Sequence, residues 1–99
     1  MKKVTGIKVR GSRWFQKSYG NTYHTVYIYV VINGKVSEFY VPFTYGYGDS
    51  YEQSAFEKLI TEGILQNKRD MQTLYSYCRD NNLEYDYSVI DVNRKKDLY

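Results

Sequence analysis

The sequence predicts an α+β fold: a two-layer sandwich whose antiparallel sheet, with elements in the order β-β-β-α-α-β, carries helices on one face. Three observations predict it: an Asn-Gly pair between two alternating runs, two later runs with helical spacing, and alternating segments near both ends. At 99 residues the chain is long enough for one domain with a modest core. We expect a single α+β domain over residues 1–99, with residues 1–3 and 94–99 frayed.

The first strand is expected at Thr5–Arg10, where apolar and polar side chains alternate. Gly11-Ser12 is expected to bulge this strand, and Trp14-Phe15 to continue it. Tyr19–Thr22 is expected to form a turn, because its Gly-Asn pair tolerates positive φ angles.

The strongest local signal is Asn33-Gly34, which lies between two alternating β-rich runs and predicts a two-residue hairpin turn. Such a turn pairs Ile28 with Phe39 and His24 with Phe43. One face of the hairpin is then the core face: Val26, Ile28, Val30, Phe39, Val41 and Phe43. The opposite face holds Tyr27, Tyr29, Val31, Val36, Glu38 and Tyr40. Pro42 suits a strand end or an edge strand.

Two helices are expected to follow. The first has Ser50 as its N-cap in a capping box with Gln53, and it runs to about Leu65. Its core stripe is Ala55, Phe56, Leu59, Ile60 and either Gly63 or Ile64. The second helix is expected from Asp70 to about Asn81, with these residues buried: Met71, Leu74, Tyr75 and Cys78. A last strand is expected at Tyr85–Asn93.

The composition limits the classes of function. Thirteen tyrosines indicate half-buried surfaces and interfaces, because tyrosine combines an apolar ring with a polar end. The net charge of +3 permits an anionic partner without requiring one. A single cysteine excludes an intrachain disulfide and fits a reducing cytoplasm. No apolar run suits a signal peptide or a membrane span, so we expect no membrane partner.

The first candidate site is the sheet face that the helices would leave open. It holds Tyr27, Tyr29 and Tyr40, and Trp14 would join them by opposing Tyr27. Its basic rim would be Lys8, Arg10 and Arg13. Aromatic rings with a basic rim suit single-stranded nucleic acid. The same surface also suits a protein partner or a homodimer, and cross-strand tyrosines can simply stabilise a sheet.

The second candidate is the loop Thr44–Gln53, with the sequence TYGYGDSYEQ, which leads into the first helix. A helix start favours an anion, and Gly46 and Gly48 would let the backbone approach one. The rings that could stack on a base or donate a hydroxyl are Tyr45, Tyr47 and Tyr51. Asp49 would repel a phosphate, and the two glycines form neither a P-loop nor a dinucleotide-binding motif. A ligand site and simple packing both remain open.

The third candidate is His24, the only histidine, which the hairpin places beside this loop and near Asp49. The pair could act as acid and base, although a lone histidine at a strand end more often forms structural hydrogen bonds. One histidine and one cysteine cannot form a structural zinc site, and Cys78 is expected to be an inert core residue. We therefore expect no enzymatic activity, no metal and no cofactor.

Two segments, RWFQKSYGNTYHTV and PFTYGYGDSYEQSA, resemble small uncharacterised proteins of bacteriophages and prophages with paired GNTYH and TYGYGDxYxQ motifs. The resemblance covers roughly residues 7–60. Its matching positions are Trp14, Phe15, Gly20, Asn21, Thr22, Tyr23, His24, Val26, Thr44 to Asp49, Tyr51, Gln53 and Ala55.

The resemblance implies a phage protein in the cytoplasm of an infected bacterial host. Small phage proteins often act by binding, so we expect a non-catalytic accessory or counter-defence protein that inhibits a host or defence-system protein through its Tyr-rich surface. The shared motifs imply a local site made of Asn21, His24, Tyr45, Tyr47 and Asp49. The alternative is a single-stranded nucleic-acid or nucleotide-binding protein that uses the exposed aromatics and the basic rim.

Overall fold

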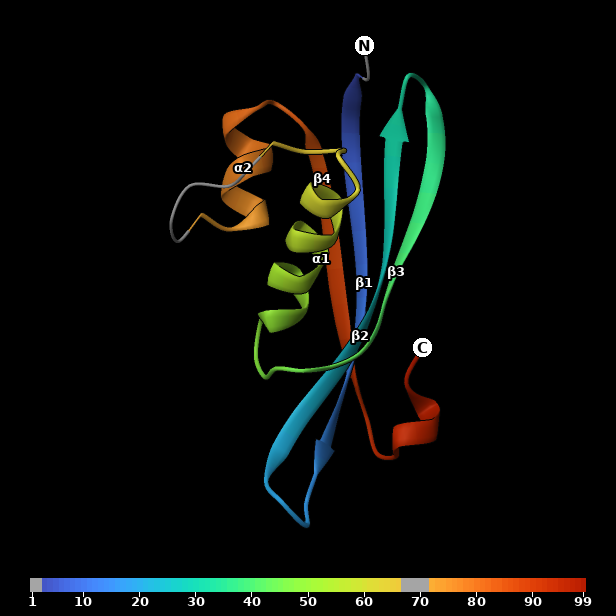
Figure 1. The fold of residues 1–99 in the computed structure, drawn as a ribbon, viewed down its shortest axis with the longest axis vertical. Coiled ribbons are helices and arrows are strands. Elements are labelled where there is room, and N and C mark those ends of the chain that lie inside the picture. The colour runs from blue at the N-terminus through green and yellow to red at the C-terminus, as the bar shows by residue number, and fades with distance from the viewer. Residues whose placement is uncertain (1–2, 67–71) are drawn as a thin grey trace.

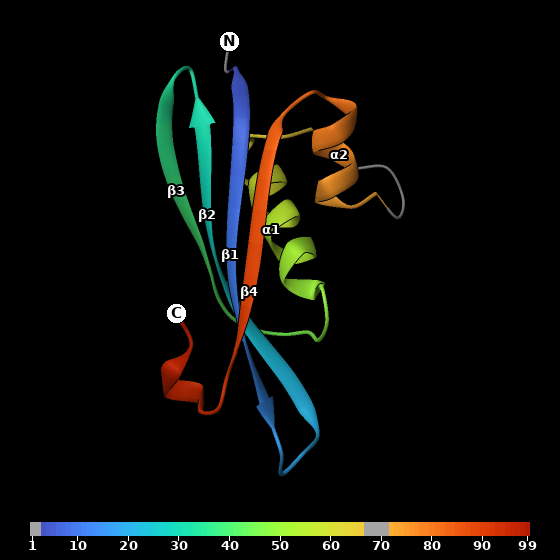
Figure 2. The same cartoon turned by 180° about the vertical axis from the view of Figure 1, so that it is seen from behind.

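The computed structural model describes residues 3–66 and 72–99 and consists of one four-stranded sheet with two helices. The elements are β1 (Val4–Gln16), β2 (Asn21–Ile32), β3 (Lys35–Tyr45), α1 (Ser50–Thr61), α2 (Leu74–Asp80), β4 (Glu84–Val92) and a 3-10 turn, η1 (Lys95–Asp97). Both helices lie on the same face of the sheet, so the α+β class with two layers is confirmed (Figure 1). Figure 2 shows the opposite face, which carries neither α1 nor α2.

The sheet has the strand order β3-β2-β1-β4 and is mixed. The β1–β2 and β2–β3 pairs are antiparallel, whereas β4 runs parallel to β1. The prediction of an antiparallel sheet is therefore wrong for this pair. β4 arrives after two helices that cross one face of the sheet, and such a crossover can return the chain in the direction of β1. Alternating polarity carries no information on strand direction.

β1 and β2 form a long hairpin that continues past the helices at the lower end of Figure 1. Gln16 pairs with Asn21, and the turn between them closes through the Gly20 amide, which donates to the Gln16 carbonyl at 2.8 Å. This turn sets a different register from the predicted one: Trp14 pairs with Tyr23 rather than Tyr27. The bulge predicted at Gly11-Ser12 is also absent, because the pairing is continuous there.

The β2–β3 hairpin confirms the predicted turn. Asn33 and Gly34 both have positive φ, 52° and 80°, as a type I′ turn requires. The pairing of Ile28 with Phe39 is as predicted, but the register shifts between His24 and Val26, and His24 pairs with Thr44 instead of Phe43. One extra residue in β3 reverses the faces of the residues that follow it. Phe43 therefore leaves the predicted core face and is 41% exposed.

The core lies between the sheet and α1. β1 and β2 contribute Ile7, Val9, Val26, Ile28 and Val30, and the helices contribute Tyr51, Ala55, Phe56, Leu59, Leu74 and Cys78. In the predicted stripe of the first helix, Ala55, Phe56 and Leu59 are buried as expected, and Ile60 and Ile64 are partly buried. Phe39 and Val41 pack at the margin of the core.

Both helices begin and end differently from the prediction. Asp49 occupies the N-cap position of α1 without a side-chain hydrogen bond, so the predicted capping box of Ser50 and Gln53 is wrong. α1 ends early because Gly63 has a φ of +74°, and the Ile64 amide donates back to the Leu59 carbonyl at 2.9 Å.

α2 begins at Leu74, after Thr73 accepts a hydrogen bond from the Ser76 amide. The predicted residues Asp70 and Met71 lie outside the described residues. Tyr75, predicted to be buried, is 53% exposed.

Residues 94–99, predicted to be frayed, include η1, and their last residue is hydrogen-bonded to the sheet. The Tyr99 amide donates to Ser12 Oγ at 3.0 Å, and the Tyr40 hydroxyl donates to the backbone oxygen of Tyr99 at 2.8 Å. Figure 2 shows this segment beside the lower part of the sheet, on the side away from the helices.

We predict that Gly11→Ala destabilises the fold. A Cβ atom at Gly11 would lie 2.7 Å from Cδ2 and 2.9 Å from Cγ of the buried Tyr51 ring. Overpacking of this kind costs about 1 to 3 kcal/mol of unfolding free energy. Urea denaturation measures it, and Gly6→Ala is the matched control, because its Cβ would meet nothing closer than 3.6 Å. Equal midpoints for the two variants would contradict the packing of Tyr51 on β1.

Candidate functional site

The sheet face away from the helices, called here the open face, carries polar and aromatic side chains in register. Lys8 on β1 pairs with Tyr29 on β2, which pairs with Glu38 on β3. One row further along, Arg10 pairs with Tyr27, and the Tyr27 and Tyr40 rings lie 4.6 Å apart. The open face therefore brings together the three tyrosines that the sequence places there: Tyr27, Tyr29 and Tyr40.

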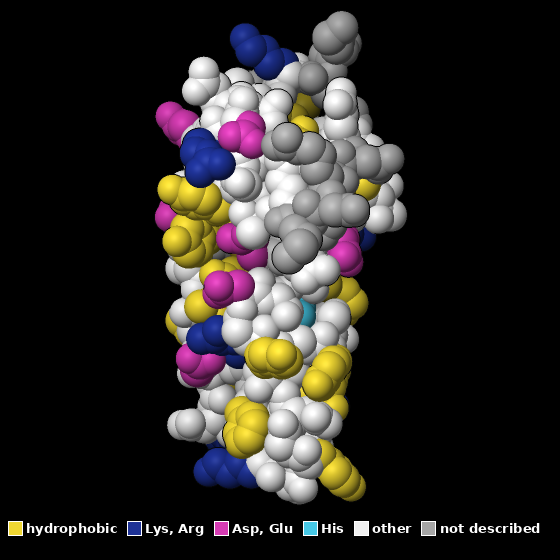
Figure 3. All heavy atoms as spheres, turned by 90° about the vertical axis from the view of Figure 1, so that its left-hand side faces the viewer, with side chains coloured by type: hydrophobic (Ala, Val, Ile, Leu, Met, Phe, Trp, Pro, Cys, Tyr) yellow, Lys and Arg dark blue, Asp and Glu magenta, His cyan; other side chains and the backbone are white. Residues whose placement is uncertain are grey.

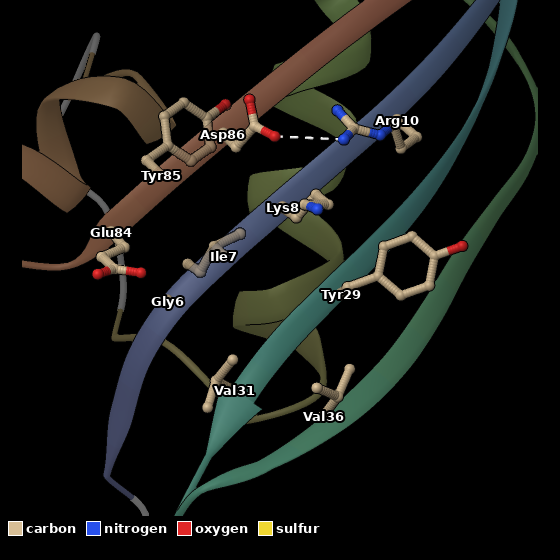
Figure 4. Close-up of a pocket in the computed structure, with 10 residues that line it drawn as sticks. All are labelled: Gly6, Ile7, Lys8, Arg10, Tyr29, Val31, Val36, Glu84, Tyr85 and Asp86. Carbon is tan, nitrogen blue, oxygen red and sulfur yellow. Dashed lines mark hydrogen bonds and ion pairs between the residues drawn. The ribbon is translucent and has the colours of Figure 1, made fainter.

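A shallow groove of about 640 Å³ lies on the upper part of the open face (Figure 4). One side of it is apolar and aromatic, formed by Tyr29, Val31 and Val36. The other side carries the β4 carboxylates of Glu84 and Asp86. The groove thus offers an apolar strip beside charged groups of both signs.

The predicted basic rim is largely neutralised. Arg10 donates to Asp86 at 3.2 Å and to Ser88 Oγ at 2.9 Å, as Figure 4 shows for the carboxylate. Within the described residues, Lys8 forms no ion pair.

Arg13 faces the helix side, where its guanidinium binds both oxygens of Asp91, at 2.8 and 3.0 Å. The hydrogen bond to Asp91 raises the pKa of Arg13 more than burial lowers it. Arg13 therefore does not belong to the open face.

The Gly-rich loop is tied into the fold. The Gly46 amide donates to the Thr22 carbonyl at 2.9 Å, and Arg13 donates to the Gly48 carbonyl at 2.9 Å. A Cβ atom at Gly46 would lie 2.7 Å from Ser50 Cβ and 2.9 Å from His24 Cε1. The structure thus explains this glycine by close packing against the protein itself. Gly48 has a φ of +61°, which favours glycine on conformational grounds.

The other predicted loop residues are spread apart. Tyr45 and Tyr47 are 61% and 71% exposed, and Asp49 is exposed at the start of α1. Asn21 pairs with Gln16 at the end of the long hairpin. Of the five residues predicted to share one local site, His24 contacts the loop, whereas Asn21 lies beyond it along β2.

His24 is fully buried between β2 and α1. Its Nδ1 lies 3.1 Å from the Gly46 carbonyl, which can only accept, so Nδ1 donates. Its Nε2 lies 2.7 Å from Ser54 Oγ and accepts from that hydroxyl. Burial lowers the pKa of His24, and the bond to the Gly46 carbonyl partly opposes this shift. Both ring nitrogens are therefore used in hydrogen bonds within the protein. This arrangement favours a structural role for His24 over acid–base chemistry with Asp49.

The sequence missed a cluster that we call the aromatic row: Trp14, Tyr23, Phe43 and Tyr45. The Tyr23 ring stacks on Phe43 at 4.5 Å and on Trp14 at 5.9 Å, and it meets Tyr45 edge-on at 5.7 Å. Lys95 Nζ lies 4.7 Å from the centre of the Phe43 ring. The register shift in β3 brings Phe43 into this row. Pro42 was the available signal, because proline cannot donate to the ladder and favours bulges.

Other classes of site find little support among residues 3–66 and 72–99. No three potential ligands come close enough to hold a metal ion there, and no helix is long and apolar enough to cross a membrane. Cys78 is buried as predicted, and burial raises the pKa of its thiol to about 12, so it remains protonated.

Comparisons with known proteins add no homologue. No protein-family model matches the chain, and neither a curated protein nor a solved structure matches it.

We predict that mild acidification lowers the free energy of unfolding, because the buried His24 resists protonation in the fold. The pKa of His24 is lowered in the fold, whereas an unfolded histidine titrates near 6.5, so unfolding takes up a proton below about pH 6.5. The stabilising contribution is therefore complete above pH 6.5 and is lost as the pH falls, by at most about 1.4 kcal/mol per pH unit.

Urea denaturation of the wild type and His24→Gln at pH 7.5 and 5.5 measures this contribution. The wild type should lose more unfolding free energy over this interval than the variant, which has no imidazole to titrate. Parallel losses in the two proteins would show that the fold accepts the protonated imidazole.

Proposed function

We propose that this chain is a small non-catalytic binding protein, an accessory or counter-defence protein of the phage type, and that it inhibits a host or defence-system protein through its open face. Its place of action is then the cytoplasm of an infected bacterial host. The phage context rests on the paired GNTYH and TYGYGDxYxQ segments, and the mode of action rests on the exposed sheet surface.

The observation that carries the proposal is the chemistry of the open face. The groove has an apolar strip of Val31 and Val36 beside the Tyr29 ring, and the paired rings of Tyr27 and Tyr40 continue it along the sheet. Val36 is 67% exposed. Exposed apolar and aromatic surface of this kind is typical of the centres of protein–protein interfaces.

Electrostatics favours a protein over a nucleic acid at this groove. Arg10 is bonded to Asp86, so it brings little uncompensated positive charge to a phosphate. Glu84 lines the same groove, and Glu38 lies beside Tyr29. Desolvation is the main cause that raises the pKa of the Tyr29 hydroxyl, and the charge of Glu38 raises it further. These carboxylates would repel a polyanion, whereas a protein partner can place its own cations opposite them.

The proposal of a non-catalytic role is supported by the state of the candidate catalytic groups. Both nitrogens of His24 are bonded within the protein, and the Cys78 thiol is buried and protonated. Neither group is placed to act on a molecule from solution.

The test is capture of partners from a lysate of a bacterial host by the immobilised protein, with and without nuclease, at 50 and 500 mM salt. A protein partner should be retained by the wild type under all four conditions, because an apolar interface depends little on salt. Val36→Lys should weaken its binding at least about tenfold, because a charge would be buried at the interface. Isothermal titration of the purified partner then measures the change.

Tyr75→Lys is the matched control, since Tyr75 is also an exposed hydrophobic side chain, 53% against 67% for Val36, and belongs to α2. It should bind the partner like the wild type. Two outcomes would overturn the proposal: retention of the same proteins by Val36→Lys, or loss of all retained proteins on nuclease treatment.

A further inference from the structure

The aromatic row lies at the opposite end of the sheet from the groove and differs from it in charge. It is built from β1, β2 and β3 where the long hairpin extends past the helices. We propose that the aromatic row, with the lysines around it, binds single-stranded nucleic acid. This site goes beyond the proposed protein-binding function and uses none of the residues of the groove.

The first support is the geometry of the rings. Three strands present four aromatic side chains to the same side, with centroid separations of 4.5 to 6.3 Å along the contacts Trp14–Tyr23, Tyr23–Phe43 and Trp14–Phe43. Tyr45, at the end of the row, is 61% exposed. Trp14 and Phe43 stack on Tyr23, and Lys95 lies over Phe43, so the rings left for an unpaired base are those at the ends of the row, Trp14 and Tyr45. Stacking on such a ring contributes about 1 to 3 kcal/mol for each base.

The second support is unpaired positive charge beside the rings. Lys17 follows β1 at the hairpin turn, and Lys95 and Lys96 belong to η1, which brings Lys95 over Phe43. In the part of the chain that the structure describes, none of these three lysines forms an ion pair.

Two of the acidic groups at this end of the molecule are already bonded. Asp97 accepts from Arg94 at 3.2 Å, and Asp91 accepts from Arg13. Asp49 also lies near Arg13, at the start of α1, and its charge contributes to the raised pKa of that guanidinium. Figure 3 shows the helix-bearing side of the molecule, where the lower end has hydrophobic and basic side chains and the acidic side chains lie above it.

The rings and the lysines together indicate which class of ligand fits the site. The lysines provide contacts to phosphates, and the rings provide surfaces for bases that are not already stacked in a duplex. A polyanion without bases would use the lysines alone. A double-stranded nucleic acid would likewise leave the rings without a partner. The groove lacks this combination, because Arg10 there is bonded to Asp86.

Trp14 makes a direct test possible, because it is the only tryptophan in the chain and lies in the row. A 20-nucleotide oligothymidylate, labelled with fluorescein, is titrated with the full chain at 50 mM salt. We expect the anisotropy to rise and the Trp14 fluorescence to fall at the same protein-to-oligonucleotide ratio. Three lysine–phosphate contacts should weaken binding roughly 15- to 20-fold between 50 and 200 mM salt. Duplex DNA and inorganic polyphosphate should leave the Trp14 fluorescence unchanged.

Variants separate the two parts of the site. Tyr45→Ser should weaken oligothymidylate binding about tenfold without a change in its salt dependence, because it removes an exposed stacking ring. Lys17→Ala, Lys95→Ala and Lys96→Ala combined should weaken binding and remove most of the salt dependence. The matched controls are Tyr75→Ser and Lys35→Ala, which change exposed residues of the same types away from the row. They should bind like the wild type.

Three results would overturn the proposal: no anisotropy change with oligothymidylate at 50 mM salt, equal binding of polyphosphate without quenching of Trp14, or unchanged oligothymidylate binding by Tyr45→Ser and the lysine variant. If those row variants instead lose the protein captured from lysate, the row is a protein interface. The test is independent of the proposed function, because Val36→Lys should still bind the oligothymidylate.

Discussion

The buried imidazole of His24 joins three parts of the chain that are far apart in the sequence. It belongs to β2, it donates to the carbonyl of Gly46 in the loop after β3, and it accepts from Ser54 in α1. A neutral imidazole with its proton on Nδ1 satisfies both partners, because the Gly46 carbonyl can only accept and the Ser54 hydroxyl can donate, and these two bonds hold strand, loop and helix together. The close approach of Gly46 depends on the same contact, since any larger residue would collide with the ring. The start of α1, and with it the position of the helix layer, follows from this contact.

The register shift beside His24 decides which aromatic side chains share a face. Without it Phe43 would point toward the helices, and Tyr23 would lack the ring on which it stacks. The extra residue keeps Phe39 and Val41 at the margin of the core while it turns Phe43 and Tyr45 outward. One irregularity in β3 thus separates the strand into a part that stabilises the fold and a part that builds a surface. Bulges often have this effect, because they re-aim side chains without ending the pairing of the strands.

Local signals in the sequence predict where the strands, turns and helices lie, but they predict less well which strands pair and in which register. The Asn33-Gly34 turn, the core stripe of Ala55, Phe56 and Leu59, and the tyrosines of the open face are all placed correctly, because each depends on a short period or a turn conformation. The parallel direction of β4 and the pairing of Trp14 with Tyr23 depend on the crossover and on the length of a turn, which no local pattern encodes. The candidate site shows the same limit. Lys8 and Arg10 face the expected way, but no sequence pattern identifies Asp86 and Asp91 as the groups that neutralise Arg10 and Arg13.

Pairing of charges, rather than their number, distinguishes the two ends of the exposed sheet. At the groove Arg10 is bonded to a carboxylate on β4, so the surface there combines apolar side chains with charges that are mostly balanced. At the hairpin end the carboxylates of Asp91 and Asp97 each bind an arginine, whereas Lys17, Lys95 and Lys96 form no ion pair with any residue that the structure describes. A balanced surface gains affinity by excluding water from apolar groups, whereas an unbalanced one gains it by releasing counterions from a polyanion. Salt concentration acts strongly on the second process and weakly on the first. The same sheet can therefore hold two surfaces that respond differently to one variable, and a net charge of +3 for the whole chain conceals that difference.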